Sequence, residues 1–127
     1  MTNIVVDMPW EGKISVNTMH FGKPSPKARG KWKKARVRKP EVQAWMDRLA
    51  WDVKAARMGW TPLGRVMVVV DFRFPDRRRR DTHNFFKAIS DAVANGLGMD
   101  DKDIRIVAGE VEIDRDNAGF TIMVNDA

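Results

Sequence analysis

Apolar residues recur every three or four positions in two stretches of the chain, a spacing that favours amphipathic helices. The first stretch spans residues 40–57; Pro40 suits the first position of a helix, and Gly59 ends the pattern. The second stretch spans residues 82–94 and is followed by an Asn-Gly pair. The apolar stripes consist of Val42, Trp45, Met46, Leu49, Val53 and Ala56 in the first stretch and Phe85, Ile89, Ala92 and Val93 in the second. We therefore predict two main helices.

The remaining hydrophobic positions alternate with polar ones or form short β-branched runs, which predicts strands. A valine-rich run that ends at Pro75 indicates a buried strand, and a polar segment at residues 114–118 predicts a hairpin turn. The predicted strands lie at residues 3–6, with a possible continuation over 10–17, and at 65–74, 107–113 and 119–124. The order β-α-β-α-β-β predicts a small α+β domain with a mixed sheet, extending over residues 1–127.

The composition limits what this domain does. A chain of 127 residues builds one hydrophobic core, and its net charge of +6 favours a polyanionic partner. The absence of cysteine excludes disulfides, thiolate zinc sites and cysteine nucleophiles, and it fits a cytoplasmic protein. No apolar run approaches about 18 residues, so we expect no membrane-spanning segment. The first residues lack a basic start followed by a long apolar stretch, so we expect no signal peptide.

Positive charge is concentrated between residues 23 and 39, where no acidic residue interrupts the lysines and arginines. Prolines and glycines in and beside this segment disfavour a continuous helix or central strand, which predicts a mobile basic loop near the N-terminus. Such side chains bind phosphates with salt-sensitive affinity, and we favour this role over that of a solvated loop. The residues expected to contact DNA here are Lys23, Lys27, Arg29, Lys31, Lys33 and Lys34.

A second basic cluster consists of four adjacent arginines, Arg77, Arg78, Arg79 and Arg80. Adjacent arginines repel one another, so a surface cluster of this kind indicates an anionic partner. Carboxylates gather farther along the chain, from Asp100 and Asp101 onward. An arginine run beside concentrated carboxylates suggests a phosphate held next to a divalent cation.

The second predicted helix has a polar stripe that differs from an ordinary exposed face. His83, Asn84, Lys87 and Asp91 lie at three- and four-residue spacing, and Asp81 stands just before the helix. Taken singly, each has an ordinary explanation: Asp81 or Thr82 as a helix cap, His83 as a surface histidine, Lys87 and Asp91 as a surface ion pair. Taken together with the arginines and Asp100–Asp101, they favour a site.

Phosphodiester hydrolysis is a reaction that would use these residue types together. A divalent cation held by carboxylates activates water and stabilises charge on the phosphate oxygens. Magnesium prefers oxygen ligands and keeps several waters, so two or three protein ligands suffice. A helix N-terminus attracts phosphate but repels a cation, and the charges of Asp81 and Asp101 would offset that repulsion.

The run from Pro75 to Asn84 resembles the signature of the RusA-type Holliday-junction resolvases, a family of bacteria and their phages. Lys87, Asp91-Ala92 and Asp100-Asp101 follow at the family's spacing, and Pro9-Trp10 and Ser15-Val16-Asn17 resemble its N-terminal strand and turn. The resemblance implies a magnesium-dependent homodimer that acts on four-way DNA junctions in recombination and repair, in the bacterial cytoplasm. It adds Asn17 to the four arginines as an expected DNA contact.

The resemblance also implies roles for individual residues. Asp81 and Asp101 would bind the metal, and Lys87 would be catalytic or contact a phosphate. Asp100 would be a further ligand, and Asp91 and Asn84 would support the ligands from behind, with Asp91 also open as a ligand. His83 stands where the family has an aspartate, so two roles remain open for it. It is either a neutral ligand that suits manganese or zinc better than magnesium, or a group that contacts substrate and transfers a proton.

Two other classes of function compete with a branched-DNA nuclease. One is a non-catalytic DNA- or RNA-binding protein in which His83 marks a decayed metal site. The other is a structural scaffold, which leaves the arginine run unexplained.

Overall fold

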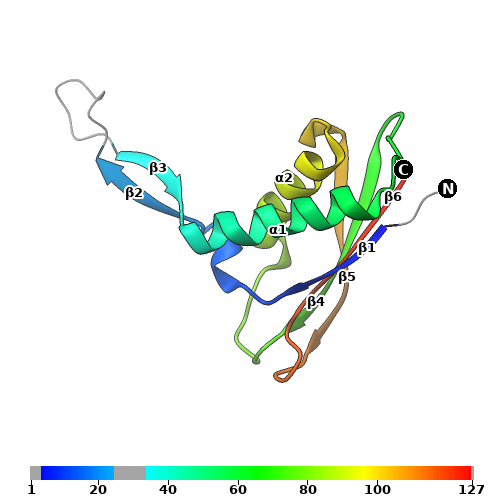
Figure 1. The fold of residues 1–127 in the computed structure, drawn as a ribbon. Helices are drawn as coiled ribbons and strands as arrows, with labels where there is room; N and C mark the ends of the chain where they lie inside the picture. Colours follow the sequence, from blue (N-terminus) through cyan, green and yellow to red (C-terminus); the bar gives the residue numbers. More distant parts are fainter. Residues whose placement is uncertain (1–3, 25–33, 127) are drawn as a thin grey trace.

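A mixed four-stranded sheet and two helices form the body of the protein in the computed structural model of the chain (Figure 1), which describes residues 4–24 and 34–126. The strands stand in the order β1-β6-β4-β5; β4 runs parallel to β5 and antiparallel to β6, and β1 is antiparallel to β6. These strands are β1 (Ile4–Pro9), β4 (Val66–Phe74), β5 (Ile104–Ile113) and β6 (Gly119–Asp126). The predicted α+β class with a mixed sheet is therefore confirmed.

Helices α1 (Pro40–Ala56) and α2 (Phe86–Leu97) pack against each other and against one face of the sheet. The two predicted helices are confirmed, although α2 begins after a 3-10 turn, η2 (Thr82–Phe85). Alternate residues of β4, from Val66 to Phe74, are buried beneath the helices. Trp10, which follows β1, stacks on Phe120 with ring centroids 5.3 Å apart. This core fixes both helices relative to the sheet.

Two parts of the N-terminal prediction were wrong. Residues 10–17 do not continue the first strand: β1 stops at Pro9, and the 3-10 turn η1 (Gly12–Ile14) follows, with the side chain of Glu11 accepting a hydrogen bond from the Lys13 amide. The basic segment is not wholly a loop, because β2 (His20–Pro24) and β3 (Lys34–Arg38) pair as an antiparallel ribbon that projects from the body (Figure 1). The backbone pairing between the two ends of the segment forms strands even though its prolines and glycines disfavour them.

Within the described residues, no helix is long and apolar enough to cross a membrane. Strand β5 starts at Ile104, three positions before the strand predicted from the sequence. The 3-10 turn η3 (Asp101–Asp103) leads directly into it. Asp101 is therefore the first residue of a turn that leads into an edge strand.

The contact between the helices depends on a glycine. A Cβ atom at Gly96 of α2 would lie 2.6 Å from the Ala50 carbonyl oxygen and 2.9 Å from the Val53 Cβ of α1. We predict that Gly96→Ala lowers the free energy of unfolding by about 1–3 kcal/mol, because the helices must move apart despite the better helix propensity of alanine. Urea denaturation checks this. Gly64→Ala is the control, since nothing lies within 4 Å of its Cβ position; equal stability of the two variants would contradict the prediction.

Candidate active site

The four arginines after β4 do not share one environment. Arg80 turns inward: its Nη1 lies 2.8 Å from Asp76 Oδ1, and its guanidinium carbon lies 5.1 Å from the ring centre of Trp10 and 5.3 Å from that of Phe74. The hydrogen bond from Arg80 is the main cause that lowers the pKa of Asp76. Asp76 also accepts from the backbone amide of Arg78, which shapes the loop. Arg80 therefore holds the loop in place.

The other three arginines, Arg77, Arg78 and Arg79, are exposed. Arg78 and Arg79 line a pocket of about 270 Å³ between this loop and the turn after η1. The two sides are joined by a hydrogen bond of 2.8 Å from the Val16 amide to the Asn84 carbonyl. Asn17, Asp81 and Asn84 also line the pocket. The structure thus brings Asn17, 60 positions before the arginine run, to the same cavity as Asp81.

Asp81 caps the turn that leads into α2. Its Oδ1 accepts a 2.9 Å hydrogen bond from the His83 amide and lies 3.6 Å from His83 Nδ1. The His83 ring meets Phe86 edge to face at 5.1 Å. Both the Asp81 and His83 side chains are largely exposed. The capping explanation for Asp81 is therefore confirmed, and it leaves the second carboxylate oxygen, Oδ2, available to a ligand.

A second cluster lies one to two turns along α2. Lys87 Nζ is 3.2 Å from Asp91 Oδ1 and 3.5 Å from Asp101 Oδ2, so the ammonium joins the helix to the turn before β5. Asp91, with only 17% of its side chain exposed, is also 3.4 Å from the Arg38 guanidinium. Lys87 is therefore close to both Asp91 and Asp101, as the sequence predicted. The ion pair between Lys87 and Asp91, which was the ordinary explanation for these two residues, is also present.

These contacts set the charge of the cluster. The pKa of Lys87 is raised, first by its hydrogen bond to Asp91 and then by the charge of that carboxylate, with Asp101 contributing less. The pKa of Asp101 is lowered, chiefly by hydrogen bonding with Asp91 and Asp100 and then by the charge of Lys87. Both side chains are therefore charged at neutral pH. Asp100 serves differently: it is exposed and caps η3 by accepting from the Lys102 amide.

The acidic side chains stand as separate groups. Among residues 4–24 and 34–126, no three histidine, aspartate or glutamate side chains are gathered as a ready-made metal centre. The structure pairs Asp81 with His83, and Asp91 with Asp101 through Lys87. All of these carboxylates lie on or beside the N-terminal half of α2 and the turn before β5.

The basic ribbon reaches the same cluster through a residue that the sequence did not single out. Arg38, at the end of β3, donates to Gln43 Oε1 at 3.1 Å and to Asp91 at 3.4 Å. In the sequence, Arg38 stood out only as one member of a basic run. Its contact with Asp91 was not predictable there, because the two residues are 53 positions apart. Lys23 and Lys34 lie on β2 and β3, whereas Lys27, Arg29, Lys31 and Lys33 lie outside the described residues.

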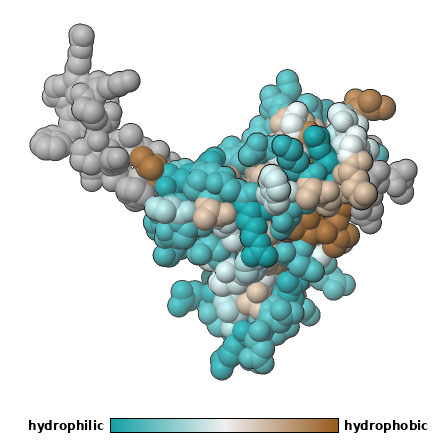
Figure 2. All heavy atoms as spheres, in the orientation of Figure 1, coloured by the Kyte–Doolittle hydropathy of each residue, from teal (hydrophilic) through white to brown (hydrophobic). Residues whose placement is uncertain are grey.

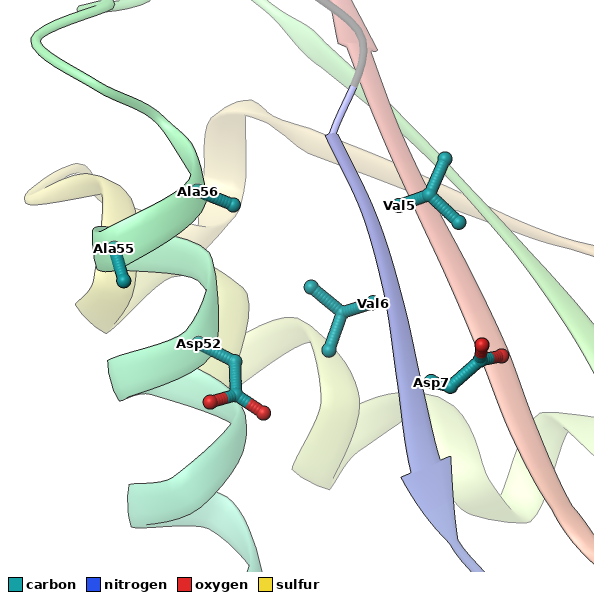
Figure 3. A pocket seen from close by; sticks show the side chains of 6 residues that line it. All are labelled: Val5, Val6, Asp7, Asp52, Ala55 and Ala56. Carbon is teal, nitrogen blue, oxygen red and sulfur yellow. The ribbon is translucent and has the colours of Figure 1, made fainter.

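A further groove, of about 450 Å³, lies between α1 and β1, remote from this cluster in the fold (Figure 3). Val5, Val6, Ala55 and Ala56 line it together with two carboxylates, Asp7 and Asp52. Among the residues that the structure describes, none that lines the groove is basic. Its charge disfavours a polyanion, so it is not the candidate active site.

Comparison with known proteins agrees with the chemistry of the α2 cluster. A family model described as endodeoxyribonuclease RusA matches residues 22–125. The matched segment includes the basic ribbon from Gly22 onward, the arginine run and both acidic groups. No curated protein matches the chain.

The division among the arginines gives a direct test. We predict that Arg80→Ala lowers the free energy of unfolding by about 1–2 kcal/mol, because a charge-assisted hydrogen bond and two aromatic contacts are lost. Arg79→Ala, at an exposed position of the same loop, should leave stability unchanged within error. Thermal and urea denaturation of both variants checks this, and the expectation is contradicted if the two behave alike.

Proposed function

The chain belongs to the RusA endodeoxyribonuclease family, and we propose that it hydrolyses phosphodiester bonds at four-way DNA junctions or related branched DNA. The observation that carries this proposal is the charged cluster of Asp91, Lys87 and Asp101 beside a pocket that contains Asp81 and two exposed arginines. Carboxylates, an ammonium and guanidiniums are thereby presented on one region of the molecule. The proposed physiological role is in DNA recombination and repair in the bacterial cytoplasm.

The basic groups account for DNA binding. Arg77, Arg78 and Arg79 are exposed and free of ion pairs among the described residues, so they are available to phosphates. Asn17 faces the same pocket and adds an amide that bonds to a phosphate or a base edge. The basic ribbon projects from the body and extends the surface along which a DNA arm would lie (Figure 1).

The donor chemistry of the site fits a hard divalent cation. Asp101 is held ionised, Asp81 has an oxygen free of its capping bond, and Asp100 and Asp91 stand close by in the chain and fold. We propose magnesium, with manganese as the alternative because His83 adds a nitrogen donor. When bound, such an ion stabilises charge on the phosphate oxygens and promotes ionisation of the attacking water.

The protein's own groups supply the rest. Lys87 keeps its positive charge beside the carboxylates, and in the proposed mechanism its ammonium contacts the scissile phosphate and stabilises the charge that develops there. Asp91 holds Lys87 in place, and Arg38 in turn holds Asp91. Asn84 is at the pocket wall, and His83 is exposed near Asp81, where it either binds the ion or transfers a proton to the leaving oxygen.

One observation favours a second candidate. The acidic side chains form pairs and not a single three-ligand group within the described part of the chain, which is what a non-catalytic junction-binding protein with a decayed metal site would show. The two candidates differ in ion uptake: calorimetric titration with manganese gives binding heat for the nuclease and none for the decayed site.

Cleavage of a labelled four-way junction with magnesium or manganese tests the nuclease directly. We predict that Asp81→Asn and Asp101→Asn each lower the rate by on the order of 100-fold or more, because charge that stabilises the transition state is lost. Junction binding in a gel-shift assay should change little. Asp116→Asn, in the exposed turn between β5 and β6, is the control. If neither ion supports cleavage by the unaltered protein, the nuclease proposal fails; if Asp81→Asn cuts normally, the site assignment fails.

Arg38 provides a second test of the same site. We predict that Arg38→Gln lowers kcat by about 10-fold, because Asp91 loses one of the two cations that fix it and Lys87 is less well placed. Arg38→Lys should restore part of the rate. The control is Arg48→Gln, on the exposed surface of α1, where a 3.8 Å pair with Asp52 is lost. Single-turnover cleavage measures the rate; an unchanged kcat with a raised KM would show that Arg38 acts only in DNA binding.

A further inference from the structure

A second pocket adjoins the pocket that contains Asp81. It has a volume of about 430 Å³ and lies between η1 and the arginine loop (residues 75–81). Its lining includes Trp10, Glu11, Gly12 and Lys13 from the segment around η1 and Arg78 and Arg80 from the loop. Gly12, Arg78 and Arg80 also line the pocket that contains Asp81. A DNA strand with a phosphate at Asp81 therefore reaches the second cavity, here called the η1 pocket, with its next nucleotide.

Contacts within the protein hold the walls of the η1 pocket in place. The Trp10 ring stacks on Phe120, and the guanidinium carbon of Arg80 lies 5.1 Å from the centre of the same ring. Ile14, the last residue of η1, is fully buried in the core. The pocket is therefore built before a ligand arrives, and binding does not have to order it.

The polarity of this region disfavours an apolar ligand. Figure 2 shows mostly hydrophilic residues around η1 and the arginine loop, whereas a larger apolar area lies over the start of β1. The Arg78 side chain is exposed and available to a phosphate. Of the described residues that line the η1 pocket, only Glu11 is acidic. Because a carboxylate repels a phosphate, the place beside Glu11 suits the uncharged part of a nucleotide, its base.

Glu11 is held so that one carboxylate oxygen remains for a ligand. Its Oε1 accepts a 3.2 Å hydrogen bond from the Lys13 amide, and Oε2 makes no hydrogen bond or ion pair with any described residue. The Lys13 ammonium is paired with Glu41 at 2.8 Å and not with Glu11. An ionised carboxylate accepts hydrogen bonds and donates none. Oε2 therefore suits the exocyclic amino group of a base.

The indole of Trp10 adds a donor to the same pocket. A Cβ atom at Gly12 would lie 3.5 Å from Trp10 Nε1, so the glycine leaves this edge of the ring uncovered. Within the described part of the chain, Nε1 makes no hydrogen bond. Cytosine, adenine and guanine each carry an amino group together with an acceptor, which a neighbouring acceptor and donor recognise; thymine has no amino group.

The volume of the η1 pocket limits what it holds. About 430 Å³ is typical of cavities that enclose one small molecule, so the pocket accommodates a nucleotide and not a base pair. A base that enters must leave its partner strand, which costs least where stacking is already interrupted. The branch point of a junction is such a place.

We propose that the η1 pocket holds the unpaired base of the nucleotide next to the scissile phosphate. Arg78 contacts the phosphate, and Glu11 Oε2 accepts a hydrogen bond from the amino group of the base. Glu11 is thereby a specificity-determining residue that favours cytosine, adenine or guanine over thymine beside the cut. The inference rests on the proposed function for the place of the scissile phosphate, whereas capture of the base requires only that a junction is bound.

2-Aminopurine, whose fluorescence rises when it leaves the base stack, tests the capture. It is placed in turn at each position around the branch point of a four-way junction, and the protein is added without divalent cation so that nothing is cut. We expect the fluorescence to rise at one position relative to the branch point. A bound junction in which no position responds overturns the proposal.

A pocket-filling variant shows whether the η1 pocket causes the rise. Gly12 does not have a positive φ, so Gly12→Leu places a side chain in the pocket without backbone strain. This variant should still bind the junction in a gel-shift assay but lose the rise. Gly64→Leu is the control, because nothing lies within 4 Å of its Cβ position. Circular dichroism verifies that both variants are folded, and a rise that persists in Gly12→Leu overturns the proposal.

Replacement of a single oxygen tests Glu11. Glu11→Gln keeps an oxygen for the Lys13 amide and replaces the other oxygen with an amino group. On four junctions that differ only at the captured base, the unaltered protein should cut the thymine junction about 10-fold more slowly than the best of the others, and Glu11→Gln should reduce this difference to about 2-fold. Glu112→Gln, exposed on β5 and outside the pocket, should keep it. An equal difference in the unaltered protein and in Glu11→Gln overturns the role of Glu11.

These experiments separate base capture from the nuclease proposal. If neither ion supports cleavage of any junction, the nuclease proposal fails, and the fluorescence rise and its loss in Gly12→Leu still decide whether the η1 pocket takes a base. If junctions are cut but no base leaves the stack on binding, the nuclease proposal stands and base capture fails.

Discussion

The close contact of α2 with α1 at Gly96 determines where the candidate active site stands. Because no side chain separates the helices there, α2 lies deep enough for Ala88, Ile89, Ala92 and Val93 to be buried against the sheet. The opposite side of the same helix then carries Lys87 to η3, the turn before β5, where it meets Asp101. The position of the charged cluster is thus a consequence of helix packing: an α2 displaced by a bulkier residue would separate Lys87 from its second carboxylate.

Each charged side chain in the site either forms an ion pair or is exposed to solvent. Asp91, the least exposed of the acidic side chains in the cluster, is held by two cations, as the cost of burying a carboxylate requires. Asp101 is more exposed and makes the longer of the two contacts with Lys87, so a cation within the chain balances its charge less closely than that of Asp91. The guanidinium of Arg80 likewise bonds to Asp76 and packs on two aromatic rings, whereas those of the three arginines before it are exposed to solvent.

The sequence was sufficient for features that local patterns encode. Helical periodicity located α1 and α2, and Asp81 to Asn84 was recognised at the start of α2 because a capping residue and a polar stripe are contiguous in the chain. It was insufficient where the determinant is tertiary. The ion pair between Arg38 and Asp91 joins residues 53 positions apart, and the difference between Arg80 and Arg79 depends on where Trp10 lies. The ribbon of β2 and β3 was missed because cross-strand pairing, and not composition, creates it.

The valine-rich run of β4 joins these observations. As a sequence it predicts burial on both faces, and within one chain the structure supplies burial on only one. The basic groups that suit DNA lie on the ribbon, the arginine loop and the N-terminal side of α2, whereas the uncovered sheet face carries acidic and basic residues at opposite ends of an apolar row. A polyanion therefore suits the first of these surfaces and not the second.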